Sequence, residues 1–197
     1  MNITAAAIKQ LREKTGAGLM EVKRALEQSK GDAEEAIKYL RASGQKFAAK
    51  MSARTTKEGK IGYYVHSDGK TAGLVAVACE TDFVALTEDF SQLVHDLAMH
   101  VTAFNPRYLD STQIPPDVIK NERNIFRAQI AKEGKPKQLH DKIIEGKLKS
   151  YYKENCFVNQ PFVKDDTKSI EDLLKEYIAK LGENIRIVSF ARLSLGA

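Results

Sequence analysis

The fold of this chain depends on one stretch, in which the apolar run Ala72-Gly73-Leu74-Val75-Ala76-Val77-Ala78 leads into Cys79-Glu80-Thr81-Asp82-Phe83-Val84. The run is short and rich in Val and Leu, which is typical of a well-covered strand. Thr87, followed by two acidic residues, predicts the N-cap and first turn of a helix. Asp82 and Phe83 therefore fall on a short connector, where recognition residues are common. The alternative is structural, with Phe83 packed beneath the helix and Asp82 capping a turn.

The composition indicates a soluble globular chain, with 197 residues of which 43% are hydrophobic and 29% charged. This length suits one sizeable domain and a small one. The longest apolar run, Ala72 to Cys79, is shorter than the ~20 residues of a membrane helix, and the start shows no secretory pattern. Two cysteines without a pattern fit neither a disulfide framework nor a zinc site. We therefore expect a cytoplasmic protein.

The positive charge of the chain is unevenly distributed. The formal net charge is +5, yet residues 1–60 alone hold thirteen basic and seven acidic residues, a surplus of six positive charges. A local surplus suggests an acidic partner surface, either protein or nucleic acid. The alternative is a solvated helix face of mixed charge, which the interleaved acids favour.

The first fifty residues contain three segments in which apolar residues recur at helical spacing. We predict one helix that Thr4 caps, a second from Leu19 to about Gly31, and a third that Asp32 caps and Gly44 ends. The apolar positions are Ala7, Ile8, Leu11, Leu19, Val22, Leu26, Ala36, Ile37 and Leu40.

Three short helices share only a tiny core, which is marginally stable by itself. The helices therefore predict a small docked module, and it resembles the ubiquitin-associated three-helix fold. Residues 45–59 have few apolar anchors and several basic residues, which predicts a basic helical tether. We place the first domain, module plus tether, at residues 1–54 and the second at residues 55–197.

A β-hairpin is the strongest local prediction. Residues 59–67 alternate, with Ile61, Tyr63 and Val65 on one side and Tyr64 and His66 on the other. Asp68-Gly69 follows, the residue pair that a two-residue hairpin turn with positive φ demands. The return strand then begins at Lys70 and runs into the opening motif.

The strongest helix pattern starts near Phe90 and ends at Asn105-Pro106. Further helices are predicted from Pro115 to Gly134, from Pro136 onward, and from Ser169 to Gly182.

Short strand-like patches complete the second domain, at residues 156–158 and 161–163. The chain closes on an alternating strand, in which Ile185, Ile187 and Leu193 oppose Val188 and Phe190. These patterns predict an α+β fold, with the N-terminal three-helix module followed by an antiparallel sheet packed with helices.

The sequence lacks the usual signatures of catalysis. The histidines and cysteines show no metal-ligand spacing, Gly16-Ala17-Gly18 lacks the context of a phosphate loop, and no nucleophile elbow occurs. His100 lies beside the apolar stripe of the strongest helix, where a half-buried structural histidine is the plainer interpretation. The residues therefore favour a binding protein over an enzyme.

Six fragments in register together resemble bacterial translation elongation factor Ts. They are Thr15-Gly16-Ala17-Gly18-Leu19-Met20-Glu21-Val22-Lys23-Arg24-Ala25-Leu26, Glu80-Thr81-Asp82-Phe83-Val84, Ala98-Met99-His100-Val101, Glu133-Gly134-Lys135-Pro136, Gln160-Pro161-Phe162-Val163 and Gly182-Glu183-Asn184-Ile185. Each fragment alone is weak, but together they run essentially from end to end in the family's order. The chain is similar to the compact single-repeat type, which implies a homodimer.

The resemblance implies guanine-nucleotide exchange on elongation factor Tu, in which this chain performs no covalent chemistry and needs no cofactor of its own. It implies neither DNA nor a membrane as a partner. The motif Thr81, Asp82, Phe83 and Val84 would act as a wedge that displaces the partner's Mg²⁺ and disturbs its phosphate loop. The partner-binding residues that the resemblance implies are Lys9, Arg12, Leu19, Met20, Lys23 and His100.

A basic nucleic-acid-binding module is the alternative function, and the positive surplus in residues 1–60 motivates it. It predicts an RNA affinity that falls steeply with salt. The segment has few aromatic residues for stacking on single strands, only Tyr39 and Phe47, which argues against it.

Overall fold

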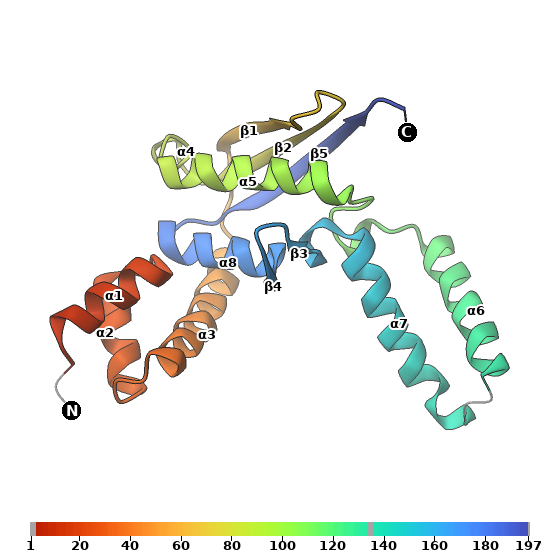
Figure 1. Cartoon of the computed structure of the whole chain (residues 1–197), viewed down its shortest axis with the longest axis horizontal. Coiled ribbons are helices and arrows are strands. Elements are labelled where there is room, and N and C mark those ends of the chain that lie inside the picture. The colour runs from red at the N-terminus through yellow and green to blue at the C-terminus, as the bar shows by residue number, and fades with distance from the viewer. Residues whose placement is uncertain (1–2, 134–135, 197) are drawn as a thin grey trace. The chain divides into compact units, whose positions relative to one another are not determined.

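A computed structural model describes residues 3–133 and 136–196 (Figure 1). Its elements are α1 (Ala5–Thr15), α2 (Leu19–Gln28), α3 (Ala33–Met51), β1 (Glu58–Val65), β2 (Thr71–Cys79), α4 (Asp82–Ala85), α5 (Glu88–Phe104), η1 (Ser111–Gln113), α6 (Pro116–Lys132), η2 (Lys137–Leu139), α7 (His140–Asn155), η3 (Phe157–Asn159), β3 (Pro161–Phe162), β4 (Asp165–Ser169), α8 (Ile170–Leu181) and β5 (Arg186–Ser194). No helix in this described part is long and apolar enough to span a membrane.

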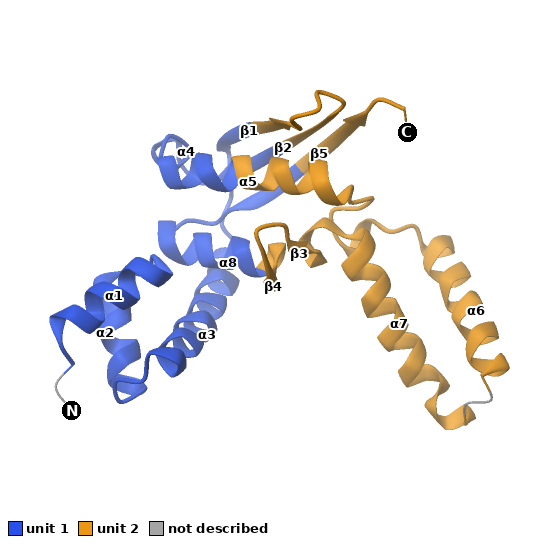
Figure 2. Ribbon diagram, viewed as in Figure 1, with its two compact units in different colours: residues 1–61, 76–94, 172–188 blue, residues 62–75, 95–171, 189–197 orange. Residues whose placement is uncertain are grey.

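The chain has the predicted α+β architecture. The main sheet has the strand order β1-β2-β5, and β3 pairs antiparallel with β4. Two compact units divide the chain: unit 1 comprises residues 1–61, 76–94 and 172–188, and unit 2 comprises residues 62–75, 95–171 and 189–197 (Figure 2). The domain boundary near residue 54 stays a prediction, because unit 1 combines the N-terminal helices with later segments.

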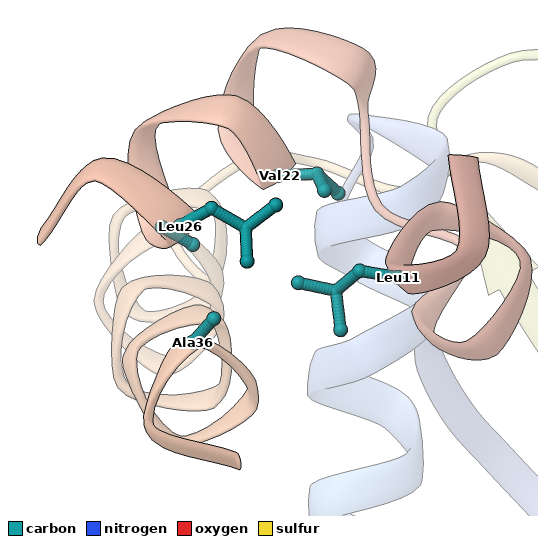
Figure 3. Packing of buried hydrophobic residues seen from close by; sticks show 5 residues of the cluster. Leu11, Val22, Leu26 and Ala36 are labelled. Carbon is teal, nitrogen blue, oxygen red and sulfur yellow. The ribbon is translucent and has the colours of Figure 1, made fainter. Parts of the chain in front are cut away.

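In unit 1, helices α1 to α3 share a small core (Figure 3). Its buried members are Leu11, Val22, Ala25, Leu26 and Ala36. The predicted caps are confirmed, since the Thr4 hydroxyl accepts a hydrogen bond from the Ala7 amide at 3.2 Å and the Asp32 carboxylate from the Glu35 amide at 3.0 Å. Such caps satisfy amides that the first turn leaves without an intrahelical partner.

The predicted end of the third helix at Gly44 is wrong, because α3 continues to Met51. A glycine inside a helix costs only about 1 kcal/mol relative to alanine, and the continuation buries Ala48 and Met51. Gly44 also allows close packing, since a Cβ placed there would lie 3.4 Å from the Cβ of Ala179 in α8. The first part of the predicted tether is therefore the second half of α3.

The predicted hairpin of β1 and β2 is confirmed, but its turn differs from the predicted type. The His66 amide donates to the Thr71 carbonyl at 2.8 Å, and the Gly69 amide donates to the His66 carbonyl at 2.8 Å. Among the turn residues 66–71, only Gly69 has a positive φ, at +66°. Asp68 instead accepts from the Lys70 amide at 2.8 Å, so its side chain stabilises the turn in place of a left-handed backbone.

The part of α5 that belongs to unit 2 packs against the start of β2. A Cβ on Gly73 would lie 2.6 Å from the Ala98 carbonyl oxygen, so the absent side chain lets helix and strand approach closely. On β1, Tyr64 lies edge-on to His95 with ring centroids 5.7 Å apart, which places Tyr63 on the opposite face.

The side-chain alternation predicted for the last strand is partly wrong. Ile187 is buried and Phe190 also turns inward, against Phe157 at 5.2 Å between ring centroids, whereas Val188 and Leu193 are exposed. A strict period of two cannot turn both Ile187 and Phe190 inward, because they are three positions apart, an odd spacing.

Helices α6 and α7 form a hairpin in unit 2 with a satellite core of Ile130, Ile144 and Leu148 (Figure 1). Helix α6 begins at Pro116, one residue after the predicted start, with Pro115 as its N-cap. The predicted helix stop at Gly134, and Lys135 of the Glu133–Pro136 fragment, lie outside the described residues. Of the strand-like patches at residues 156–163, only Pro161–Phe162 is a strand, paired with β4.

Candidate functional site

The segment Thr81–Leu86, called here the α4 corner, forms a one-turn helix where a connector was predicted. The Thr81 hydroxyl caps it by accepting from the Val84 amide at 3.3 Å, and the Asp82 carboxylate accepts from the Phe83 amide at 2.9 Å. Phe83 is 80% exposed and Leu86 is 75% exposed. The structural alternative for Phe83 is therefore wrong, because its ring is not packed beneath the helix.

Buried groups on either side of the corner hold it in place. Cys79 precedes it, is fully buried and donates its thiol hydrogen to the Thr81 carbonyl at 3.2 Å. Ala85 is buried within it. Thr87 follows and accepts from the Phe90 amide at 3.2 Å, which confirms the predicted cap of α5. The aromatic ring and the carboxylate thus project from a backbone with little freedom to move.

The residues expected to bind a partner in the N-terminal module lie on α1 and α2. Leu19 and Met20, at the start of α2, are exposed, Met20 by 68%. This corrects the prediction that Leu19 shares the core face with Val22. The basic members, Lys9, Arg12 and Lys23, are also exposed. The surface of α1 and α2 thus presents two apolar and three basic side chains from this set.

Lys180 of α8 connects this module to the start of α5 within unit 1. Its ammonium lies 2.6 Å from the Asp89 carboxylate. Its aliphatic stem packs on Gly16, where an added Cβ would lie 3.3 Å from the Lys180 Cε. Gly16 has a φ of +66°, which ends α1 and suits glycine. The turn that leads to Leu19 therefore rests on the lysine that is paired with α5.

The structure places His100 in the interior of unit 2, which corrects its expected role in partner binding. The ring is fully buried, stacked on Phe104 and Phe157 with centroids 4.6 Å and 5.5 Å away. Its Nδ1 accepts from the Val163 amide at 3.3 Å, so Nε2 carries the hydrogen that points to the side-chain Oε1 of Gln160 at 3.0 Å. The imidazole therefore has no exposed surface to offer a partner.

A family model described as elongation factor TS matches residues 1–197 of this sequence. The chain belongs to the elongation factor Ts family. It is 48% identical over 197 residues to elongation factor Ts of Nitratidesulfovibrio vulgaris, covering 100% of this chain and 98% of that one. The identity is 47% over 196 residues with the factor of Fervidobacterium nodosum, covering both chains completely. With the factor of Maridesulfovibrio salexigens it is 49% over 195 residues, covering 99% and 95%.

Membership of the elongation factor Ts family makes the chain a translation elongation factor. Sequence reasoning missed one exposed member of its candidate site, Leu86. A signal was available, because Leu86 follows Phe83 by three residues and precedes the N-cap of the next helix. No group of three or more His, Cys, Asp or Glu side chains within residues 3–133 and 136–196 could hold a metal ion.

The buried imidazole predicts an acid-dependent stability for this protein. Burial lowers the pKa of His100 from 6.5 to about 4. Because the unfolded chain takes up the proton first, the free energy of unfolding should be highest above pH 6.5 and fall as the pH is lowered toward 4. The loss contributed by this group should reach about 3 kcal/mol.

Chemical unfolding at several pH values between 4 and 7.5 measures this dependence. His100→Gln should flatten the pH slope in that range, although its stability at pH 7.5 should be lower. His66→Gln, at an exposed histidine, should keep the wild-type slope. An unchanged slope in His100→Gln would contradict the assignment.

Proposed function

We propose that this protein is a guanine-nucleotide exchange factor for elongation factor Tu, acting without covalent chemistry. One observation carries the proposal: Phe83 is 80% exposed beside the exposed Asp82 on a capped one-turn helix. A large apolar ring held in water is costly unless a partner covers it. A carboxylate next to the ring suits a target that contains a cation.

The proposed target is the magnesium ion and phosphate loop that hold GDP on the partner. Magnesium bridges the phosphates and neutralises their charge, so its displacement removes a main term of nucleotide binding. In this mechanism Thr81 and Val84 shape the α4 corner, while Asp82 and Phe83 enter the partner and disturb the ion site. The chain itself needs no cofactor for such a displacement.

The required energy indicates that the corner does not act alone. Each tenfold acceleration of GDP release needs about 1.4 kcal/mol, so a 10³- to 10⁵-fold effect needs about 4 to 7 kcal/mol. Burying one exposed aromatic ring supplies about 1.5 to 3 kcal/mol. We propose that the docking residues supply the remainder, namely Lys9, Arg12, Leu19, Met20 and Lys23.

Preorganisation lowers the conformational entropy that these groups lose when the partner binds. The α4 corner is capped at Thr81, and the turn before Leu19 packs on Lys180. Groups held in their binding geometry lose little entropy on association. By linkage, a factor that weakens GDP binding is itself bound more weakly when GDP is present, which lets it dissociate.

Release of labelled GDP from purified elongation factor Tu tests the proposal. The rate should rise steeply when this protein is added and should saturate with its concentration. A rate that stays at the unassisted value over the whole range of added protein would overturn the proposed function.

The nucleic-acid alternative gains little from the structure. Several basic residues in the N-terminal part form ion pairs with acids. The Lys9 ammonium lies 4.0 Å from the Glu13 carboxylate, and the Lys38 ammonium lies 2.6 Å from the Glu35 carboxylate. Such pairs reduce the field that would attract phosphates. We therefore do not propose nucleic-acid binding as the function.

We also propose that the chain forms a homodimer through the outer face of its sheet. Tyr63 and Val65 of β1 and Leu193 of β5 are exposed on the face opposite to α5, Tyr63 by 70% and Leu193 by 69%. Exposed apolar side chains gathered on one face of a sheet mark an interaction site. A second copy offers the same surface across a two-fold axis.

Substitution of Tyr63 by lysine tests the dimer. Tyr63→Lys should reduce the solution mass from two chains to one, because a buried charge would lie at the interface. Sedimentation equilibrium measures the mass, and circular dichroism checks the fold. Leu139→Lys, at an exposed position in the α6–α7 hairpin, should leave the mass unchanged. A Tyr63→Lys protein with the wild-type mass would contradict the interface.

Two further features remain proposals. The ubiquitin-associated likeness of the N-terminal module rests on its three short helices and their single small core. A cytoplasmic location agrees with two free and buried cysteines, Cys79 and Cys156.

A further inference from the structure

The base of the α4 corner is held by a glutamate that lies about a hundred residues away in the sequence. Glu183 follows α8 and accepts three hydrogen bonds within unit 1. Its Oε2 accepts from the Glu80 amide at 3.0 Å and the Thr81 amide at 3.1 Å, and its Oε1 accepts from the Thr81 hydroxyl at 2.6 Å. A carboxylate that receives several donors forms short and strong hydrogen bonds.

The two segments hold each other reciprocally. The Oε1 of Glu80 accepts from the Asn184 amide at 2.7 Å, in the direction opposite to the bonds received by Glu183. The Asn184 side-chain amide donates to the Arg54 carbonyl at 2.8 Å, beyond the end of α3. Glu80 and Glu183 thus form a clamp between the corner and the chain after α8, and Asn184 extends it toward the N-terminal module.

Thr81 links the clamp to Asp82 and Phe83. A hydroxyl has one hydrogen to donate, and in Thr81 that hydrogen goes to Glu183. This donation orients the hydroxyl oxygen so that it can accept from the Val84 amide at 3.3 Å, the bond that caps α4. The carboxylate therefore sets the rotamer of the cap, and the cap sets the direction of the helix that carries Asp82 and Phe83.

The local sequence places Glu183 where its side chain can reach the α4 corner. The Gly182 amide donates to the Ile178 carbonyl at 2.9 Å, and Gly182 has a φ of +77°, so α8 ends there in a left-handed turn. The turn directs the next side chain, Glu183, to the corner.

We propose that Glu183 is a positioning residue for nucleotide exchange, acting through Thr81 on Asp82 and Phe83 without touching the partner. This inference rests on the proposed exchange function. A displacement of about 1 Å in a group that acts at another site costs about 100-fold in rate. Loss of the clamp should therefore lower the maximal rate of exchange more than the affinity for the partner.

Glu183→Gln tests the inference, because glutamine keeps the size of the side chain but has a single acceptor oxygen and an added donor group. At saturating factor, the stimulated rate of GDP release should fall about 10- to 100-fold. The concentration of factor that gives half the maximal rate should change little, because the docking residues of α1 and α2 are intact. Glu154→Gln, at an exposed position of α7, is the matched control and should behave as wild type.

A second pair of variants decides the matter if Glu183→Gln folds poorly. Thr81→Val removes the hydroxyl and should reproduce the loss of maximal rate, whereas Thr81→Ser keeps the hydroxyl and should retain most of it. A wild-type maximal rate in Glu183→Gln or in Thr81→Val would overturn the positioning role.

Amide hydrogen exchange tests the clamp independently of the proposed exchange function. Glu183→Gln should speed exchange at the amides of Glu80, Thr81 and Val84, and Glu154→Gln should not. Unchanged protection at these amides would overturn the clamp. If protection is lost as expected but the wild-type protein does not stimulate GDP release, the proposed function fails while the clamp stands.

Discussion

Phe83→Ala should remove nearly all stimulated GDP release, a loss of about 100-fold or more, while leaving the fold and the self-association unchanged. The ring is 80% exposed, so its removal should change the free energy of unfolding by only about 0.5 kcal/mol. In the complex the same ring would be fully buried near the ion site. Central aromatic residues of interfaces cost about 2 to 4 kcal/mol when truncated. At about 1.4 kcal/mol for each tenfold in rate, a 100-fold loss corresponds to about 3 kcal/mol.

The measurement is the rate of labelled GDP release from elongation factor Tu at saturating variant. Ile125→Ala removes an exposed apolar side chain from α6 and serves as the control, with an expected rate equal to that of wild type. Chemical unfolding and sedimentation confirm that both variants remain folded and associated. Normal exchange by Phe83→Ala would exclude the wedge mechanism, whatever the family membership.

Local patterns predicted those features whose causes lie within a few residues. The caps at Thr4, Asp32 and Thr87 depend on hydrogen bonds three residues away, so the sequence contains both partners at a fixed spacing. The same holds for Gly182, whose left-handed conformation ends α8. The starts of these helices and the end of α8 were therefore predictable without knowledge of the tertiary structure.

Features that depend on distant partners were not predictable in this way. Leu19 fits the apolar spacing of its helix yet is exposed, because the small core is filled from Val22 onward. His100 is completely buried because aromatic rings from its own helix and from η3 enclose it. The continuation of α3 past Gly44 depends on packing against Ala179 of α8, more than a hundred residues away.

The candidate site shows the same division. The motif Thr81–Val84 could be recognised from its position between a strand and a helix. The exposure of Phe83 could not, because an apolar ring is buried or exposed according to its tertiary surroundings. The hydrogen bonds of Glu183 to Glu80 and Thr81 join residues about a hundred positions apart, so no local pattern indicates them.

Gly59→Ala should destabilise the protein by about 3 kcal/mol or more. Gly59 of β1 has a φ of +151°, which an L side chain rarely adopts, and an added Cβ would lie 2.1 Å from the Val77 carbonyl oxygen of β2. The atom in the way belongs to the backbone of the paired strand, so the clash can be relieved only if the two strands separate. Overpacking and backbone strain each cost about 1 to 3 kcal/mol, and a urea unfolding curve measures their sum as a lower midpoint.

Gly146→Ala is the matched control, because it makes the same chemical change where the structure has room. Gly146 lies inside α7, and a Cβ there would meet nothing within 4 Å. Alanine should stabilise this helix by about 0.5 to 1 kcal/mol, since glycine gives up more backbone entropy on folding. A Gly59→Ala midpoint equal to wild type would contradict the close approach of β1 to β2. The strain at Gly59 should also affect the α4 corner, because the displaced residue of β2, Val77, lies only two residues before Cys79. Gly59→Ala should therefore lower the rate of stimulated GDP release. Gly146→Ala should leave that rate unchanged.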